Sequence, residues 1–349
     1  MNVAFRVDVT PSAGFGHLLR CLSLAEVFTE IGVDVVFVFS SLPAELNDRL
    51  KTSQIAFVLF EGPISSLSID EVSDPYTHNQ HLDAGLTIES LKFEIIDVVF
   101  VDHYGLDSVW ESLMRPYCKT IVAFDDFTGR HHCCDYIIDQ NISDLLAPQY
   151  LECNEGQCNL LTGYKYSLVS REYRRLRMSA PVRTRLTRIL VYFTSGNDCG
   201  QTKLVLSALK EVGFAGYVDV VASSNTADDQ QILKLCESSG WNFHRYAQMS
   251  ELAYKADLAF GSCGVHAMER CVVGLPSITT VLSTNQINAS SLIVESGASL
   301  SVGWYEDVQV TDYVRLIYSA DLGQMSTIAL NLIDGAGAFR ILEAIMKDK

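Results

Sequence analysis

A strand, a glycine-containing loop and a helix follow one another twice in this chain, and this recurrence constrains the fold most. In residues 5–28, a short apolar run precedes the loop of residues 11–16, and apolar residues then recur at helical spacing. In residues 258–272, a second apolar run leads into Gly261-Ser262-Cys263-Gly264 and a second helical pattern. A helix that starts after such a loop presents unpaired N–H groups and a positive dipole end. Both loops are therefore candidate sites for an anionic ligand.

Uninterrupted apolar runs alternate with helical segments along the rest of the chain. Residues 35–39 and 95–101 are typical of buried strands in a parallel sheet covered on both faces. Residues 42–50 are expected to form a helix, whereas residues 63–86 are polar and are expected to be irregular. Polar clusters follow the strands, at Asp102-His103, Asp125-Asp126 and Gln140-Asn141. Because ligands bind beyond the carboxyl ends of such strands, we expect these clusters to share one rim with His17.

Composition limits the partners of the chain. Its 349 residues are enough for two domains, and 48% of them are hydrophobic. A formal charge of −16 argues against nucleic acids and anionic membrane surfaces as general partners. The apolar runs are too short to span a bilayer, and residues 1–6 lead directly into a strand without a signal-peptide pattern. We therefore expect a cytoplasmic protein whose ten cysteines are free thiols.

The string G-F-G-H-x-x-R-C-x-x-L-A at residues 14–25 resembles the opening of a known enzyme family. That family is the UDP-2,4-diacetamido-2,4,6-trideoxy-β-L-altropyranose hydrolases of the pseudaminic acid pathway. Further matches are DHYG at 102–105, FDD at 124–126, REY at 171–173, GSCGVHAMERCVVGLP at 261–276 and TNQ at 284–286. The resemblance implies a GT-B-like α/β fold, with two Rossmann-like domains whose parallel sheets face each other across a cleft.

The resemblance also implies a domain division and a reaction. Residues 1–163 would form the N-terminal domain, 164–186 a connector, 187–325 the UDP-binding domain, and 326–349 a helix packing back on the first domain. Water would attack the anomeric carbon of a UDP-linked diacetamido sugar with inversion, releasing UDP without a metal or other cofactor. The expected partners are the UDP-sugar and UDP alone, and a monomer is the working assumption.

His17 is the candidate catalytic base. It lies in the first turn of the predicted helix, where the positive helix end disfavours an imidazolium, so a neutral ring able to accept a proton is expected near pH 7. Asp8 or His103 is expected to orient His17 or the attacking water. The competing interpretation is that His17 caps the helix or is a satisfied core residue.

The residues expected to bind the substrate come from both halves. By the resemblance, Glu269 accepts hydrogen bonds from the ribose hydroxyls, and the N–H groups of residues 263–266 hold the diphosphate. Where the family usually has two adjacent glycines, this chain has Ser195-Gly196, which permits a less close approach. The other expected contacts are Gly14, Phe15, Gly16, Arg20, Tyr104, Asp125, Asp126, Asn197, Ser262, Cys263, Gly264, Val265, His266, Asn285 and Gln286.

Two groups of histidines and cysteines resemble metal ligands in isolation. His131-His132-Cys133-Cys134 are adjacent, and four adjacent ligands cannot close a tetrahedron without a chain reversal. His78 and His81 lack a third ligand with a suitable context. We therefore predict a structural role for the first group, a solvated loop for the second, and no metal site.

Three other functions remain open. A glycosyltransferase with the same fold would replace water by an acceptor hydroxyl, and a hydrolysing 2-epimerase of UDP-sugars shares the fold class. A UDP-sugar-binding protein without activity is the third alternative, which the Ser195-Gly196 departure favours.

Overall fold

Two parallel sheets organise the chain. The computed structural model describes residues 1–9, 15–42, 50, 55–60, 79–91, 95–141, 147–153, 158–193, 197–222, 227–245 and 247–347. These residues divide into two compact units, one formed by Met1–Tyr166 with Ala338–Lys349 and the other by Ser167–Gly337. We call them unit 1 and unit 2, and each contains one sheet.

The described part of unit 1 contains a seven-stranded sheet with the strand order β3-β2-β1-β4-β5-β6-β7. Every neighbouring pair is parallel, so each strand is followed by a crossover that returns to the same edge. In chain order the elements are β1 (Asn2–Val7), α1 (Gly16–Glu30), β2 (Asp34–Phe39), β3 (Ala56–Leu59), α3 (Gln80–Leu91), β4 (Ile96–Asp102), α4 (Ser108–Met114), η3 (Arg115–Tyr117), β5 (Cys118–Phe124), β6 (Tyr136–Asp139), α5 (Pro148–Cys153), β7 (Asn159–Thr162), η4 (Tyr164–Tyr166) and α14 (Gly337–Lys347).

A row of phenylalanine rings fixes α1 on one face of this sheet. Phe5 of β1 is paired with Phe37 of β2 and with Phe100 of β4, and its ring stacks on theirs at centroid distances of 4.8 and 4.5 Å. Phe28 of α1 packs edge-on against Phe100. Because side chains alternate between the two faces of a strand, residues in step with Phe5 and Phe100 point towards α1.

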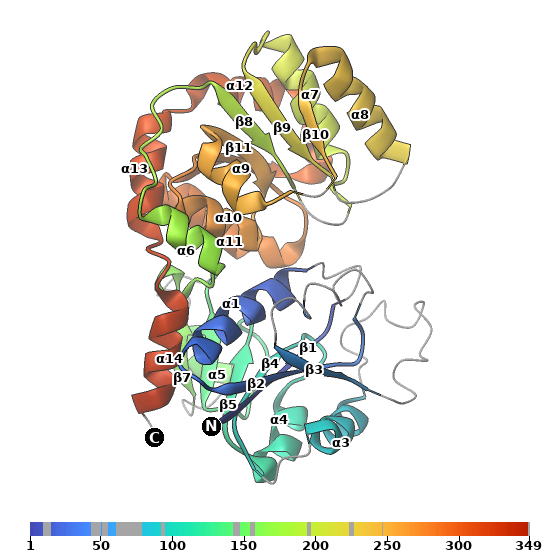
Figure 1. Cartoon of the computed structure of the whole chain (residues 1–349), viewed down its shortest axis with the longest axis vertical. Helices are drawn as coiled ribbons and strands as arrows, with labels where there is room; N and C mark the ends of the chain where they lie inside the picture. Colours follow the sequence, from blue (N-terminus) through green and yellow to red (C-terminus); the bar gives the residue numbers. More distant parts are fainter. Residues whose placement is uncertain are drawn as a thin grey trace. The chain divides into compact units, whose positions relative to one another are not determined.

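Helices α3 and α4 cover the opposite face (Figure 1). Trp110 and Met114 of α4 pack there with Leu91 of α3 and the intervening strand residues. The prediction that residues 63–86 are irregular was wrong from residue 80 onwards, because α3 begins at Gln80. Its buried face carries Asp83 and Thr87, and these polar residues obscure the apolar periodicity that would mark a helix.

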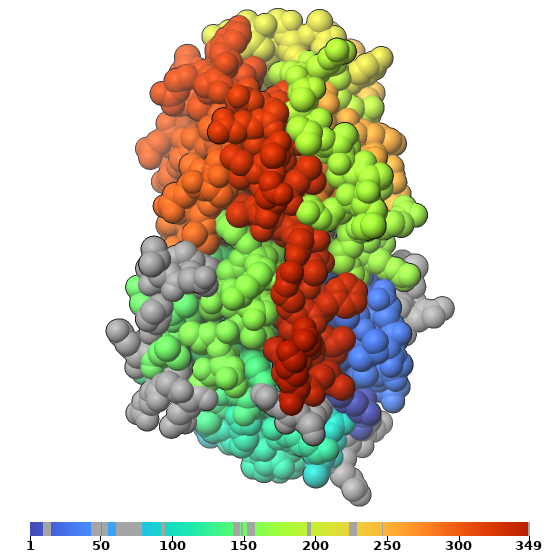
Figure 2. Space-filling view, turned by 90° about the vertical axis from the view of Figure 1, so that its left-hand side faces the viewer, coloured from blue at the N-terminus to red at the C-terminus, as the bar shows by residue number. Residues whose placement is uncertain are grey.

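The last helix, α14, belongs to unit 1. Its buried residues Ala338, Ile341 and Ile345 lie on one face at helical spacing. The hydroxyl of Tyr136 in β6 donates to the Ala344 carbonyl at 3.2 Å. Figure 2 shows the outer side of α14, coloured red, at the molecular surface.

The described part of unit 2 contains a six-stranded parallel sheet with the order β10-β9-β8-β11-β12-β13. Helices α7 and α12 cover one face, where Leu206, Leu209 and Tyr313 are buried. Its elements are α6 (Arg171–Arg177), β8 (Arg188–Val191), α7 (Gln201–Glu211), β9 (Tyr217–Val221), α8 (Ala227–Ser239), β10 (Asn242–His244), α9 (Met249–Lys255), β11 (Leu258–Ser262), α10 (Val265–Val272), β12 (Ser277–Val281), η5 (Thr284–Gln286), α11 (Ile287–Ser296), β13 (Ser299–Trp304), η6 (Tyr305–Asp307), α12 (Val310–Ser319) and α13 (Leu322–Leu332).

The alternation of strands and helices predicted for both halves is confirmed, and the fold is α/β with two Rossmann-like sheets. The helix expected over residues 42–50 falls almost wholly outside the described residues. In the part of the chain that the structure describes, no helix has both the length and the apolar character needed to cross a bilayer.

Candidate active site

The carboxyl edge of the unit 1 sheet contains its topological switch point. From β1 the chain passes through α1 to β2, and from β4 it passes through α4 to β5, so neighbouring strands β1 and β4 lead away in opposite directions. Open α/β sheets bind ligands at such a point. Val7 at the end of β1 is paired with Asp102 at the end of β4, and α1 begins just beyond β1.

His17 and Asp102 form a buried pair at this point. The Nδ1 atom of His17 lies 2.6 Å from Oδ1 of Asp102, and only 8% of the histidine side chain is exposed. Burial opposes ionisation of Asp102, but the charges of Arg20 and His17 hold the pKa of its carboxyl far below the usual range. A carboxylate only accepts hydrogen bonds, so Nδ1 of His17 carries the proton and donates it.

Arg20 connects this pair to a second carboxylate. Its Nε and Nη2 donate to the two oxygens of Asp102, each at 2.6 Å, and its Nη1 donates to Asp126 Oδ1 at 2.8 Å. The hydroxyl of Tyr104 and the amide of Asn141 also donate to Asp126, at 2.6 and 2.8 Å. Every nitrogen of Arg20 thus contacts a carboxylate, which fits the positioning of Asp102 and Asp126 better than the predicted direct contact with substrate.

The cluster around His17 carries a net negative charge. Asp102 and Asp126 carry two negative charges against the single positive charge of Arg20, and attraction to Arg20 lowers the pKa of Asp126 although burial opposes its ionisation. The ring of Tyr104 packs edge-on against the imidazole, with centroids 4.7 Å apart. With Nδ1 committed to Asp102, Nε2 has no hydrogen-bond partner among the described residues. The geometry suits an imidazole that accepts a proton at Nε2.

The described contacts of Asp8 and His103 do not include His17, and their predicted part in orienting the attacking water stays a prediction. The Oδ1 atom of Asp8 accepts from the backbone N–H of Ser40 at 2.7 Å, and its Oδ2 accepts from Arg6 Nη2 at 2.8 Å. Nε2 of His103 lies 3.4 Å from Asp8 Oδ2, and Nδ1 of His103 accepts from the Gly105 N–H. Burial opposes ionisation of Asp8, but Arg6 and His103 hold its pKa well below the usual range.

Strand alternation explains this division, and it is the signal that could have identified Asp102. Asp102 is in step with Phe100, and Asp126 with Phe124, so both point towards α1. Asp8 is in step with Arg6, which contacts Asp83 of α3 on the other face. Asp125 also points away from His17, because it accepts from Arg130 and lies 3.2 Å from His132 Nε2.

The predicted loop before α1 is described only at its end. Phe15 is the N-cap residue of α1 and Gly16 is its first residue, which places His17 in the first turn as predicted. The N-cap makes no side-chain hydrogen bond. Gly14 lies outside the described residues.

In unit 2, α10 begins directly after the loop at the carboxyl end of β11. Gly264 is its N-cap residue and makes no capping bond, and the N–H groups of Val265 and His266 have no partner among the described residues. The Nδ1 atom of His266 lies 2.7 Å from Glu269 Oε2, one turn along the helix. Val265, His266 and Glu269 thus lie together near the helix start, where an anion would be favoured.

The two glycines of this loop have different surroundings. A Cβ on Gly261 would come within 2.4 Å of the Tyr192 carbonyl oxygen, so packing inside unit 2 requires this glycine. A Cβ on Gly264 would have no neighbour within 4 Å, so the backbone is accessible there. Ser262 and Cys263 are buried, and the Ser262 hydroxyl donates to the Phe193 carbonyl at 2.5 Å. The described contacts therefore give Ser262 a structural part and leave Gly264 open to a ligand.

The remaining predicted residues of unit 2 stabilise local turns. Oδ1 of Asn197 accepts from the Cys199 N–H at 2.9 Å before α7, and Ser195-Gly196 lies outside the described residues. Oδ1 of Asn285 accepts from the Ser283 hydroxyl, and Oε1 of Gln286 accepts from the Leu282 N–H. These contacts shape the loops at the carboxyl ends of β8 and β12.

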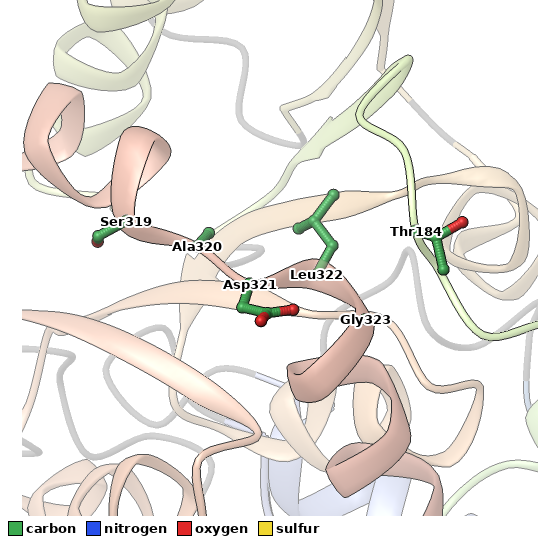
Figure 3. Close-up of a pocket in the computed structure, with 6 residues that line it drawn as sticks. All are labelled: Thr184, Ser319, Ala320, Asp321, Leu322 and Gly323. Atoms are coloured by element: carbon green, nitrogen blue, oxygen red, sulfur yellow. The ribbon is translucent and has the colours of Figure 1, made fainter.

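A shallow depression on unit 2 contains none of the predicted residues. Figure 3 shows Thr184 across from Leu322 and Asp321, on the turn between α12 and α13. Asp321 there caps α13 by accepting from the Gln324 N–H at 3.0 Å. The depression is lined by a single charged side chain and lies at a helix–helix turn, so it does not suit an anionic nucleotide.

Two curated proteins are similar in sequence. The chain is 28% identical over 174 residues, half of its length, to a UDP-2,4-diacetamido-2,4,6-trideoxy-β-L-altropyranose hydrolase of Campylobacter jejuni, of which the match covers 53%. It is 20% identical over 297 residues to the uncharacterised protein MJ1062 of Methanocaldococcus jannaschii, covering 82% of this chain and 56% of that protein. The chain spans about half the length of the curated relatives it matches. No protein-family model matches it.

Solved structures similar to this chain include glycosyltransferases. MurG of Acinetobacter baumannii superposes with a TM-score of 0.66 at 12% identity, over 99% of this chain and all of that one. UGT71G1 of Medicago truncatula, solved in complex with UDP-glucose, gives the same TM-score and identity over 99% of this chain and 98% of that one. At these identities the likeness concerns the fold, and the chain has the GT-B-type fold of these glycosyltransferases.

Proposed function

We propose that the chain hydrolyses a UDP-linked 2,4-diacetamido-2,4,6-trideoxy hexose of the altrose type, giving UDP and the free sugar. The observation that carries this proposal is the His17–Asp102 pair at the switch point of unit 1. The sequence match to the Campylobacter hydrolase supports the substrate class. The resemblance of the sequence motifs around His17 and Glu269 to that hydrolase family adds to it.

Unit 1 would supply the base. Asp102 holds the proton on Nδ1, so the lone pair of Nε2 can accept a proton from a water molecule. The water oxygen forms a bond to the anomeric carbon while the bond from that carbon to the phosphate oxygen breaks. The electron pair leaves with UDP, and Asp102 keeps its hydrogen bond to Nδ1 of the ring that has taken the proton. A single displacement of this kind inverts the anomeric configuration.

Unit 2 would hold the nucleotide. The unpaired N–H groups of Val265 and His266 suit the diphosphate, whose charge rises as the bond breaks. The carboxylate of Glu269, oriented by His266, would accept from the ribose hydroxyls. This arrangement calls for no cofactor.

Substitution of the buried pair tests the proposal. We expect His17→Asn and Asp102→Asn each to lower kcat by about 10²–10⁴-fold. The first substitution removes the base, and the second removes the carboxylate that holds the proton on Nδ1 of His17. The affinity for UDP, measured by calorimetry, should change little in His17→Asn. His81→Asn, at an exposed histidine of α3, is the matched control and should keep full activity. Undiminished turnover in His17→Asn would remove this residue from the mechanism.

A glycosyltransferase is the second candidate, because the same pair would deprotonate an acceptor hydroxyl as readily as water. Proton NMR of the products from UDP-diacetamido sugars, with and without sugar acceptors, distinguishes the two. Release of free sugar at a rate independent of acceptor supports hydrolysis, with heavy oxygen from labelled water on the sugar hydroxyl. Label on UDP would indicate attack at phosphorus, and turnover only with acceptor would indicate a transferase.

A further inference from the structure

A cluster of buried metal-ligand side chains lies on the α4 face of unit 1, apart from the His17 pair. Glu111 of α4, His132 and Cys134 each present one ligand atom, and these three atoms lie within 4.8 Å of one another. The Nδ1 atom of His132 is 2.7 Å from Glu111 Oε1. All three residues are buried, and Cys134 belongs to the core cluster that contains Trp110 and Met114 of α4.

A second cysteine, Cys158, lies beside Cys134, although it is not part of the group whose ligand atoms all lie within 4.8 Å of one another. The Sγ atoms of Cys134 and Cys158 are 3.6 Å apart, and both thiols are free and buried. A disulfide requires about 2.05 Å between the sulfurs. Ligand pairs around a tetrahedral zinc ion are separated by roughly 3.3–3.8 Å, given zinc–nitrogen and zinc–sulfur bonds of about 2.0–2.3 Å. The sulfur pair has a separation in this range, whereas His132 Nδ1 and Glu111 Oε1, 2.7 Å apart, are at hydrogen-bond distance and would have to separate to share one metal ion.

The surroundings of these donors match the outer shell of a metal site. The other ring nitrogen of His132, Nε2, lies 3.2 Å from Asp125 Oδ2. Asp125 is itself held by Arg130 Nη1 at 3.0 Å. The second oxygen of Glu111 accepts from the Cys133 backbone N–H. Histidines that bind metals commonly donate their second N–H to a carboxylate, which fixes the ring orientation.

We propose that Glu111, His132, Cys134 and Cys158 bind one zinc ion. Two sulfurs and an imidazole favour zinc over magnesium or calcium, and four protein ligands leave no open position for water or substrate. The site is therefore structural. Zinc binding releases the two thiol protons and leaves both sulfurs as thiolates.

The location of the four residues indicates what a bound zinc ion would stabilise. Residues 125–135 connect the parallel strands β5 and β6 without a helix, and they carry His132 and Cys134. Cys158 directly precedes β7, and Glu111 lies on α4. A zinc ion would therefore tie this irregular crossover to α4 and to the start of β7. The adjacent residues 131–134 cannot close a tetrahedron by themselves, and the fold brings Glu111 and Cys158 to His132 and Cys134.

The alternative without a metal uses the same atoms. A protonated His132 would satisfy both Glu111 and Asp125, and the Cys158 thiol would donate to the Cys134 carbonyl oxygen, which lies 3.1 Å away. The two arrangements differ in metal content and in the state of the sulfurs, and both can be measured on the full chain.

The test is elemental analysis of the full chain purified without chelators, followed by exchange with cobalt. We expect about one zinc ion per chain. Cobalt substitution should give a thiolate-to-cobalt charge-transfer band and the visible spectrum of a tetrahedral ion. Cys134→Ser and Cys158→Ser should lose the metal and the band. Cys236→Ser, at a buried cysteine of α8 in unit 2, is the matched control and should keep both.

The cobalt spectrum of the unmodified chain needs no variant, so misfolding of a serine variant does not decide the outcome. Glu111→Gln, which keeps the size of the side chain, should weaken zinc binding in competition with a chromophoric chelator. Wild-type chain that holds neither zinc nor cobalt after incubation with either ion overturns the proposal. So does a Cys134–Cys158 disulfide found by peptide mapping of the chain as isolated, or full zinc content in Cys134→Ser.

Discussion

Asp139 ends β6 as a buried carboxyl group with an unusual titration. It accepts from the Asn141 N–H at 2.8 Å and from the Tyr150 hydroxyl at 2.9 Å. Burial and the nearby charge of Asp126 raise its pKa to about 7, against about 3.9 in an unfolded chain. Between these values the folded chain binds more protons than the unfolded one, so Asp139 makes stability fall as pH rises towards and through 7.

We expect Asp139→Asn to remove this dependence. Relative to the variant, the wild type should lose up to roughly 4 kcal/mol of unfolding free energy between pH 4 and pH 8. Urea unfolding of both proteins across that interval measures the difference. Asp34→Asn, at an exposed aspartate, is the control. Parallel curves for wild type and Asp139→Asn would show that Asp139 is ionised in both states.

A site residue could be predicted from the sequence only where the face of the strand that carries it did not need to be known. His17 could be placed because a glycine loop fixes where α1 begins. Asp102 and His103 are adjacent, and only the face of β4 decides which one meets His17. The row formed by Phe37, Phe5 and Phe100 carries that information, but it becomes readable only when the register of the strands is known.

At the scale of elements, α3 is attached to the sheet by a buried ion pair. Asp83 of α3 accepts from Arg6 of β1 through Nε at 3.0 Å and Nη2 at 2.6 Å, and from the Trp110 indole at 2.9 Å. Both charged side chains have no exposed surface. A carboxylate on the inner side of a helix breaks the apolar pattern, so no helical periodicity marks the start of α3 at Gln80.

We expect Asp83→Ala to destabilise the chain by about 3–5 kcal/mol, because it leaves a buried guanidinium with one carboxylate fewer. Asp97→Ala is the matched control. It removes a carboxylate that pairs with the exposed Lys119 at 2.7 Å, a contact that contributes about 0–1 kcal/mol, and that accepts from the Asn2 N–H at 2.9 Å, a hydrogen bond that contributes about 0.5–1.5 kcal/mol. Thermal and urea unfolding of the three proteins measure both changes. Equal effects of the two substitutions would contradict the claim that the Arg6–Asp83 pair stabilises the attachment of α3 to the sheet.

At the scale of the whole chain, the organisation into two sheets follows from local sequence patterns. The residues at which each unit begins and ends cannot be predicted from such patterns. The apolar strands and the two glycine loops are marked by patterns only a few residues long, so the α/β class could be predicted, whereas β7 and β13 were not predicted. The assignment of residues 167–186 to a unit depends on long-range contacts, since α6 packs against α9 and α10 within unit 2. The cluster around Cys134 is also non-local, because its members are separated along the chain.

The division between α13 and α14 leads to a test on fragments. Ile341 and Ile345 of α14 are buried within unit 1, and burial of each isoleucine contributes about 1.5–3 kcal/mol. Residues 1–166 alone should therefore be unstable, whereas the same residues joined to 338–349 by a flexible linker should unfold cooperatively. Residues 167–337 should fold without the linker and without residues 338–349, because this fragment contains the whole of the unit 2 sheet and its covering helices. Circular dichroism and urea titrations compare the three fragments. A control linker fragment carrying Ile341→Asp and Ile345→Asp should behave like residues 1–166, and equal stability of all unit 1 fragments would place α14 outside the core of that unit.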